Sequence, residues 1–209
     1  MNPIAPMTFA VLRYVLEHTE TAQRAAARDT GVSLGQVNKV FSWLLENSFI
    51  ERINRTHAAT SPGETGRYRL ANPTGILRAI SLFRSMKNNQ ILELNLNMKK
   101  QEAIKYLRKK KAILCLDSAL ERYDSYFRGD TICCYIDPPD RLEMIRKELS
   151  RVPLGITKIR FYRWDFPSID ILNSKDCCTT EIQTIIDLFC DNKAHYTKEL
   201  LRKSWGIEL

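Results

Sequence analysis

The 209-residue sequence has no uninterrupted apolar stretch of the ~18 residues that a transmembrane helix needs. Its first residues also lack the basic and then apolar segments of a secretory signal. We therefore expect a cytoplasmic protein with no membrane partner. Internal repeats and low-complexity tracts are missing too. With 44% hydrophobic and 27% charged residues, the composition predicts a folded chain of one or two domains.

Motifs of the common catalytic and cofactor sites are absent as well. The sequence has no G-x-S-x-G turn, no phosphate-binding loop and no dinucleotide fingerprint. Histidine occurs three times, and only His195 lies in the second half, where it is the single candidate base for a cysteine nucleophile. We predict that the protein is not an enzyme and needs no cofactor.

Cysteine is missing from the first 114 residues, and all six cysteines follow. Thiols stay reduced in the cytoplasm, and cysteine is among the most buried residue types, so we predict core cysteines rather than disulfides. Two of the cysteine pairs are adjacent in sequence, and on a strand such neighbours point to opposite faces. No metal site is expected from them. The cysteines are Cys115, Cys133, Cys134, Cys177, Cys178 and Cys190.

Positive charge exceeds negative charge, with a net charge of +8 and a pI near 9.2. Residues 1–86 contain ten basic and six acidic side chains, a net charge of +4, which leaves +4 for residues 87–209. The polar stretch 87–90 is the expected junction. We predict an α+β protein with domains at residues 1–86 and 87–209, and the basic balance favours an acidic partner such as nucleic acid.

The first half predicts helices at residues 8–17, 21–29 and 33–46, strands at 49–53 and 67–70, and a helix at 73–86. Thr8 is expected to cap the first helix and Asn47 to end the third in a left-handed conformation. Ser33 and Gln36 have capping-box spacing. The third helix carries an apolar stripe of Val37, Val40, Phe41, Leu44 and Leu45, and Ile76, Leu77, Ile80 and Phe83 are expected to face the core from the last one.

The segment from Ala27 to Ser33, followed by Val37, is the most specific part of this half. A small Ala27 lets two helices approach, Gly31 permits a sharp turn, and Ser33 caps the next helix. Residues 8–71 resemble the winged helix-turn-helix of bacterial and archaeal transcription regulators. The resemblance implies that the third helix enters the major groove of double-stranded DNA.

Candidate DNA contacts follow from that docking. Glutamine and asparagine suit adenine, and lysine suits guanine or phosphate. Cations on or beside the wing can hold a phosphate or enter the minor groove. The alternative is a solvated polar face on a winged helix that binds protein. The candidates are Ser33, Gln36, Asn38, Lys39 and Ser42 on the third helix, with Arg55, His57 and Arg67 at the wing.

The second half predicts strands near residues 92–98, 131–136 and 156–163. Helices are expected near 101–111, 112–123, 141–151, 180–190 and 196–205, with Thr180 as a cap. Segments 112–120, 132–137, 185–189 and 198–201, together with the N-terminal winged helix, resemble the AbiEi-type antitoxin and regulator family. That resemblance implies a mixed α/β second domain with a small sheet, akin to a degenerate nucleotidyltransferase fold.

Nucleotidyl transfer needs a Gly-Ser turn and two carboxylates that hold Mg²⁺. Here Asp117 and Ser118 occupy the position where the Gly-Ser turn is needed. Residue 135, where the second carboxylate would be needed, is a tyrosine, so Asp137 is the one acid that this strand supplies. One carboxylate cannot assemble a two-metal site, so we expect no catalysis by this route.

A basic run lies in the helix near residues 101–111. It is either a solvated outer face or a second contact for nucleic acid or an acidic partner. The residues concerned are Lys105, Arg108, Lys109, Lys110 and Lys111. The cluster of Tyr162, Arg163 and Trp164 belongs to the core or, if exposed, stacks on a base.

Together these features predict a sequence-specific DNA-binding regulator of its own operon, binding double-stranded DNA as a homodimer. The alternative is an antitoxin whose second domain binds a toxin, with DNA binding secondary. A third hypothesis, an enzyme acting on nucleotides or RNA, would require Mg²⁺-dependent activity that is lost in Asp137→Ala.

Overall fold

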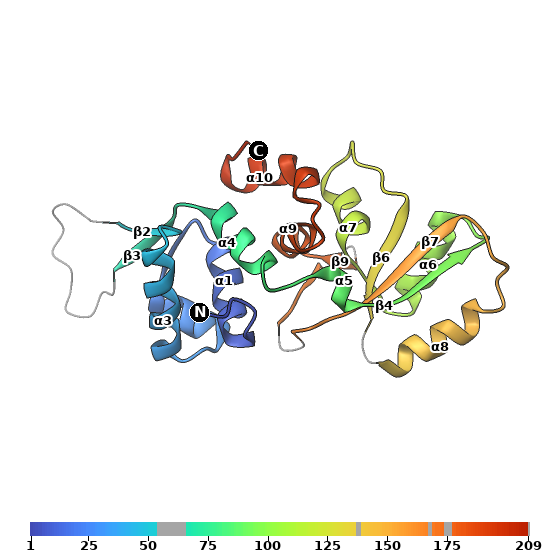
Figure 1. Cartoon of the computed structure of the whole chain (residues 1–209), viewed down its shortest axis with the longest axis horizontal. Coiled ribbons are helices and arrows are strands. Elements are labelled where there is room, and N and C mark those ends of the chain that lie inside the picture. Colours follow the sequence, from blue (N-terminus) through green and yellow to red (C-terminus); the bar gives the residue numbers. More distant parts are fainter. Residues whose placement is uncertain (54–65, 137–138, 167–168, 174–176, 209) are drawn as a thin grey trace. The chain divides into compact units, whose positions relative to one another are not determined.

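The computed structural model describes residues 1–53, 66–136, 139–166, 169–173 and 177–208 (Figure 1). The chain forms two compact units, Met1–Arg84 and Ser85–Leu209, against a predicted boundary after residue 86. The predicted α+β class is confirmed. The first unit combines helices with a three-stranded antiparallel sheet, and the second is a mixed α/β unit with a six-stranded mixed sheet.

Four helices and three short strands make up the described part of the first unit. In chain order they are α1 (Pro6–Glu17), β1 (Glu20–Ala22), α2 (Gln23–Thr30), α3 (Leu34–Glu46), β2 (Ile50–Ile53), β3 (Arg67–Leu70) and α4 (Pro73–Ser81). The sheet has the order β1-β3-β2, and both pairings are antiparallel. Strand β1 was not predicted, because its three residues are defined only by pairing with β3.

Helix α3 packs against the rest of this unit through its apolar stripe. Val37, Val40, Phe41 and Leu44 are fully buried, and the ring of Phe41 meets that of Tyr68 on β3 edge-on at 5.0 Å. Burial of large apolar side chains is the main stabilising contribution in such a small unit. The stripe therefore fixes which side of α3 faces solvent.

The turn between α2 and α3 follows its sequence closely. Gly31 adopts a left-handed conformation with φ of 68°, which favours glycine. The Thr30 hydroxyl donates to the Ala26 carbonyl (2.6 Å) and accepts from the Val32 N–H (3.3 Å). The helix-facing alanine is Ala26, which is fully buried, rather than Ala27, which is half-buried.

Three predicted details of the first unit are wrong. Helix α1 begins at Pro6, so Thr8 is a buried residue inside it and not its cap. The left-handed residue after α3 is Ser48 (φ 56°), while the Asn47 side chain donates to the Trp43 carbonyl. Phe83 is 56% exposed, because α4 ends at Ser81 and the chain turns before the next helix.

The second unit has a sheet with the order β4-β7-β6-β5-β9-β8. Strands β6 and β7 run parallel, with a helical crossover between them, and β4 pairs antiparallel with β7 at one edge. The elements are α5 (Met86–Asn89), β4 (Gln90–Leu96), α6 (Lys100–Lys109), β5 (Ile113–Leu114), α7 (Leu116–Tyr123), β6 (Thr131–Ile136), α8 (Pro139–Leu149), β7 (Thr157–Arg163), β8 (Leu172–Asn173), β9 (Cys178–Thr179), α9 (Glu181–Cys190), a 3₁₀ turn (Ala194–Thr197) and α10 (Lys198–Trp205).

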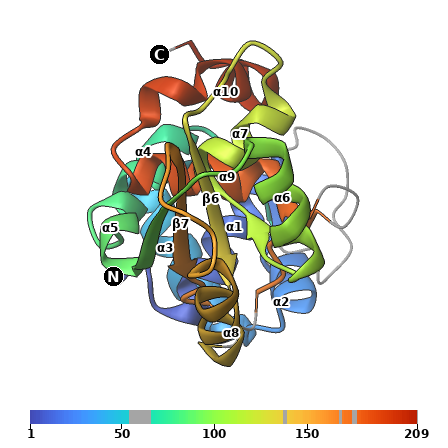
Figure 2. The ribbon, with the colours of Figure 1, turned by 90° about the vertical axis from the view of Figure 1, so that its right-hand side faces the viewer.

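Strand β6 is buried on both faces. One face carries Ile132, Cys134 and Ile136, which share a core with Leu107 of α6 and Ile145 of α8. On the opposite face Tyr135 lies edge-on to Tyr162 of β7, and its hydroxyl contacts the sulfur of Met86 at the start of α5. Figure 2 shows α6 and α5 on opposite sides of these strands.

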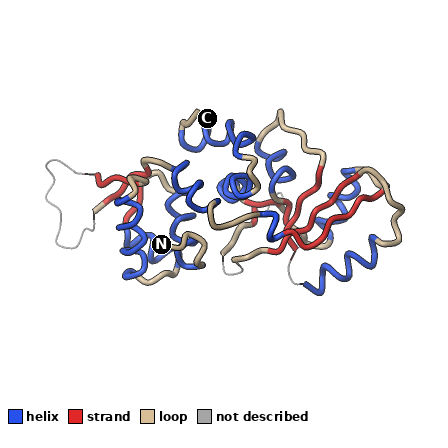
Figure 3. Tube along the Cα trace, viewed as in Figure 1, coloured by secondary structure: helices blue, strands red, loops and turns tan. Residues whose placement is uncertain are grey.

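The sequence analysis did not predict the shortest strands of the second unit. Residues 112–123 were expected to form a helix or a helix and a turn, but they contain the strand β5 before α7 begins. Strands β8 and β9 have two residues each. Figure 3 distinguishes the helices, in blue, from the strands, in red. A two-residue strand has no alternating pattern of its own and is defined only by pairing with its neighbours.

Among the helices that the structure describes, none has the length and hydropathy of a membrane-spanning segment.

The predicted core cysteines are confirmed for five of the six side chains, and Cys177 is half-buried. None of the six, all of which the structure describes, is in a disulfide. Tyr162 is 1% exposed, and Trp164 packs edge-on against Tyr135 and Phe166. Tyr162 and Trp164 therefore belong to the aromatic packing of the second unit, whereas Arg163 between them is exposed.

Gly75 of α4 supplies a stability test. A Cβ atom there would lie 2.5 Å from the Phe49 ring, whereas one at Gly35 of α3 would meet nothing within 4 Å. We expect Gly75→Ala to destabilise the protein by about 1–3 kcal/mol through overpacking. The matched change Gly35→Ala should stabilise it by about 0.4–1 kcal/mol through loss of backbone entropy in the unfolded chain. Urea unfolding followed by circular dichroism measures both, and equal effects of the two changes would contradict the packing argument.

Candidate functional site

The solvent face of α3 gathers most of the predicted DNA contacts. Ser33 caps the helix by accepting from the Gln36 N–H at 3.4 Å, as predicted. Asn38, Lys39 and Ser42 are exposed, and their side chains make no hydrogen bond or ion pair with a described residue. Gln36, expected to be exposed, is half-buried. The face therefore offers an amide, an ammonium and hydroxyl groups to an external partner.

The first turn of α3 has two further features that the prediction omitted. Leu34 is 40% exposed, and Gly35 has open space where a side chain would project. An exposed leucine beside a glycine gives this turn a small apolar surface next to its polar one. The predicted DNA contacts are all polar or charged side chains, although apolar side chains can also contact the methyl group of thymine.

Strand β3 carries two outward arginines with different surroundings. Arg69 lies between Glu20 of β1 (3.4 Å) and Glu51 of β2 (3.5 Å), so its charge is balanced within the sheet. Arg67 is exposed and makes no ion pair with any residue that the structure describes. Arg55 and His57 lie outside the described residues.

The basic segment formed by α6 and the two lysines that follow it, Lys110 and Lys111, contains paired and unpaired cations. Lys110 Nζ lies 2.6 Å from Glu148, which also accepts from the Tyr106 hydroxyl at 2.8 Å. Hydrogen bonds from Lys110 and Tyr106 lower the pKa of Glu148. Lys100 binds Glu121 and the Gly129 carbonyl.

The other predicted cations of this helix are not so engaged. Among the described residues, none forms an ion pair with Lys105, Arg108, Lys109 or Lys111, and Arg108 and Lys109 lie in the last turn of α6. Lys110 is therefore already neutralised within the unit, whereas the other four predicted contacts keep their charge for an outside anion.

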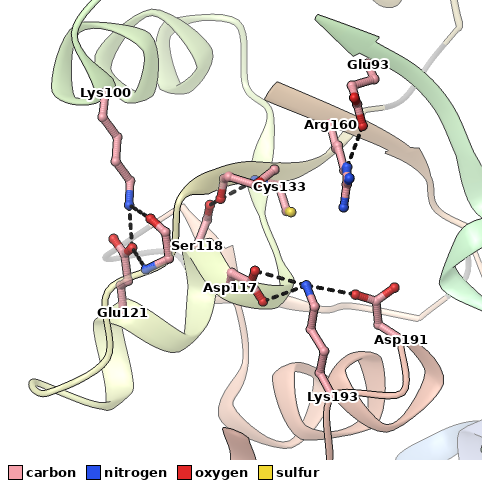
Figure 4. Close-up of polar contacts among 11 residues, drawn as sticks. Glu93, Lys100, Asp117, Ser118, Glu121, Cys133, Arg160, Asp191 and Lys193 are labelled. Atoms are coloured by element: carbon pink, nitrogen blue, oxygen red, sulfur yellow. Dashed lines mark hydrogen bonds and ion pairs between the residues drawn. The ribbon is translucent and has the colours of Figure 1, made fainter. Parts of the chain in front are cut away.

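A lysine held between two carboxylates is the polar centre of the second unit (Figure 4). Lys193, which follows α9, contacts both oxygens of Asp117 on α7 (3.1 and 3.0 Å) and Asp191 (3.0 Å). Burial acts to lower the pKa of Lys193, but the hydrogen bonds and charges of Asp117 and Asp191 outweigh it and raise the pKa. Sequence reasoning missed this cluster, since Lys193 lies 76 positions from Asp117.

Ser118 and Cys133 lie beside this centre. The Ser118 hydroxyl accepts from the Cys133 N–H at 2.9 Å, which ties α7 to β6. Burial, with a smaller effect of the Asp117 charge, raises the pKa of the Cys133 thiol to about 12. A raised pKa favours the protonated thiol, which is a weaker nucleophile than the thiolate. Asp117 and Ser118, at the position of the expected Gly-Ser turn, both serve internal contacts.

A metal site would need several ligands close together. The parts of the chain that the structure describes hold no group of three or more His, Cys, Asp and Glu side chains that could bind an ion. Asp137 lies outside them. Comparison with known proteins adds no candidate, because no family model, no curated protein and no solved structure matches this chain.

Removal of Lys193 tests the role of this polar centre. Lys193→Ala leaves Asp117 and Asp191 facing each other without a cation. We expect the free energy of unfolding to fall by about 2–3 kcal/mol. The loss is smaller than for a fully buried ion pair, because the lysine side chain is 24% exposed. Lys203→Ala, which breaks a surface pair with Glu181, should cost less than about 1 kcal/mol.

The same pair predicts a pH dependence. The pKa of Lys193 is raised in the folded state. The contribution of Lys193 to the free energy of unfolding is therefore complete at neutral pH, and it is lost as the pH rises through that pKa. Chemical unfolding of the wild type and Lys193→Ala across the alkaline range should show their stabilities converging. A constant difference would contradict the ion-pair assignment.

Proposed function

We propose that this chain is a sequence-specific DNA-binding regulator of its own operon and that its first unit is a winged helix-turn-helix. The single observation that carries the proposal is the solvent face of α3. There, exposed Asn38, Lys39 and Ser42 stand on a helix whose opposite side is locked into the core by Val37, Phe41 and Leu44. Rigid backing of this kind holds base-reading side chains in place.

The order of elements supports the same proposal. Three helices are followed by two strands of a small antiparallel sheet, β2 and β3, with residues 54–65 between them. In a winged helix-turn-helix this is the order of the recognition helix and the wing. The contact between Phe41 and Tyr68 links α3 to β3, so Arg67 belongs to a strand that packs on the proposed recognition helix.

The exposed groups match the chemistry of a duplex. An asparagine amide can pair with the N6 and N7 edge of adenine, and a lysine with guanine or a phosphate. Arg67 supplies a charge for the backbone, which fixes register without reading sequence. Binding as a homodimer to two half-sites, the usual arrangement of such modules, is part of the proposal.

For the second unit we propose a regulatory or partner-binding domain related to the nucleotidyltransferase fold and without catalysis. Its support is that Asp117 and Ser118 are buried and engaged with Lys193 and Cys133. The antitoxin alternative rests on the resemblance to AbiEi-type proteins, and no contact in the described residues favours it over regulation alone.

DNA binding by the full chain to its own upstream region tests the proposal. Asn38→Ala should weaken specific binding by about tenfold and relax preference at one base pair, because a good bidentate contact is worth about 1–3 kcal/mol. Lys39→Ala should weaken all sequences alike if it contacts phosphate, and should lower the log–log salt slope by about 1. Titration against scrambled competitor over a salt series measures both.

Arg78→Ala is the matched control, since it also removes one exposed cation from the first unit, on α4. It should leave affinity, specificity and salt slope near those of the wild type. If all three variants bind equally, or if the wild type shows no preference for the upstream sequence, the proposed reading of DNA by α3 is wrong.

A further inference from the structure

Helices α6 and α7 border an open groove of about 760 Å³ in the second unit. We call it the α6 groove and define it by its lining residues: Gln101, Ile104, Lys105, Arg108, Lys109, Leu114, Ser118, Glu121 and Arg122. Its volume falls among those of small-molecule sites, which span about 300–1,000 Å³. Every lining residue lies within the described part of the chain.

Charge in the α6 groove is strongly one-sided. Four cations line it, Lys105, Arg108 and Lys109 from α6 and Arg122 from α7. Among the described lining residues, Glu121 is the one carboxylate. It is already engaged by Lys100, which does not line the groove, and by the Gly129 N–H at 2.7 Å. The groove therefore keeps a net positive charge toward an occupant.

Arg108 gives this charge a specific geometry. Its Nε is buried and has no hydrogen-bond partner among the described residues, and the residue as a whole is half-buried. A buried donor without an acceptor is unfavourable, so a partner that supplies one is favoured. An oxyanion with two acceptor oxygens, such as phosphate, can satisfy a guanidinium through two parallel hydrogen bonds.

The remaining lining completes the match to an organic phosphate. Ile104 lines the groove and is half-buried, so part of its apolar surface is accessible beside the cations, whereas Leu114 is 1% exposed and contributes little. We propose that the α6 groove binds a small phosphorylated molecule of nucleotide size. Its phosphates would lie on Arg108, Lys105 and Lys109, and its ring or aliphatic body against Ile104. A concave site lined by three cations of α6 suits a compact polyanion better than the convex surface of a duplex.

This proposal goes beyond the proposed DNA binding and does not depend on it. A regulator whose second unit binds a phosphorylated metabolite senses that metabolite in addition to binding DNA. The α6 groove assigns the chemical class of the metabolite. The test uses the full-length protein without DNA, so its failure leaves the assignment of α3 untouched, and failure of DNA binding leaves the groove untouched.

Calorimetric titration with three probes tests the groove: inorganic pyrophosphate, adenosine diphosphate and adenosine. We expect saturable binding of the first two at low ionic strength and none of adenosine, since the phosphates carry the recognition. Arg108→Gln should weaken pyrophosphate about tenfold or more, the value of one charge-assisted hydrogen-bonded contact. Lys105→Gln should weaken it as well, and because Lys105 is exposed this change should leave folding intact.

Arg146→Gln is the matched control. Arg146 lies on α8 of the same unit with a side chain 63% exposed, so its loss lowers the net charge equally without touching the groove. It should leave pyrophosphate binding unchanged.

Equal weakening by Arg146→Gln and Arg108→Gln would show general charge attraction and overturn the proposal. Absence of saturable binding of pyrophosphate and of adenosine diphosphate would overturn it too. So would a result in which Arg108→Gln impairs only the binding of double-stranded DNA, because the groove would then hold a nucleic-acid backbone.

Discussion

Burial of β6 on both faces is the constraint on which the second unit depends. Apart from its first residue, every side chain of this strand is buried, so each face needs its own cover. Residues from α6 and α8 supply it on one side, and Met86 of α5 with Tyr162 supply it on the other. A strand enclosed in this way admits a charged neighbour only when that neighbour is paired.

The pairing of Asp117 with Lys193 follows from that constraint. Asp117 lies in the first turn of α7, shortly after β5, the strand that pairs with β6, and is 7% exposed. Without a cation beside it, the buried carboxylate of Asp117 would lose its hydration and gain no compensating ion pair. Lys193 and Asp191, at the end of α9, close the arrangement, and Ser118 attaches α7 to the backbone of Cys133. Asp117 and Ser118 thus both hold α7 in place, one through Lys193 and the other through the backbone of β6.

The two sides of α3 in the first unit differ sharply in burial. The side of α3 with Val37, Val40, Phe41 and Leu44 is buried, and the side with Asn38, Lys39 and Ser42 is open. Pairing likewise separates the cations of the second unit. Glu148 neutralises Lys110, whereas Lys105, Arg108 and Lys109 keep their charge at the α6 groove. Counting basic residues in the sequence cannot make this distinction, because the neutralising acids lie on other elements.

Local patterns in the sequence determined the longer elements of this protein. The repeat of Val37, Val40, Phe41 and Leu44 defines α3, Ser33 its start, and the apolar run 131–136 defines β6, because these signals lie within one element. Tertiary structure alone decided the short strands β1, β5, β8 and β9, the exposure of Phe83 and the partners of Arg69, Lys110 and Lys193. Each of these depends on atoms brought together from distant positions, and no local pattern encodes which distant side chain arrives.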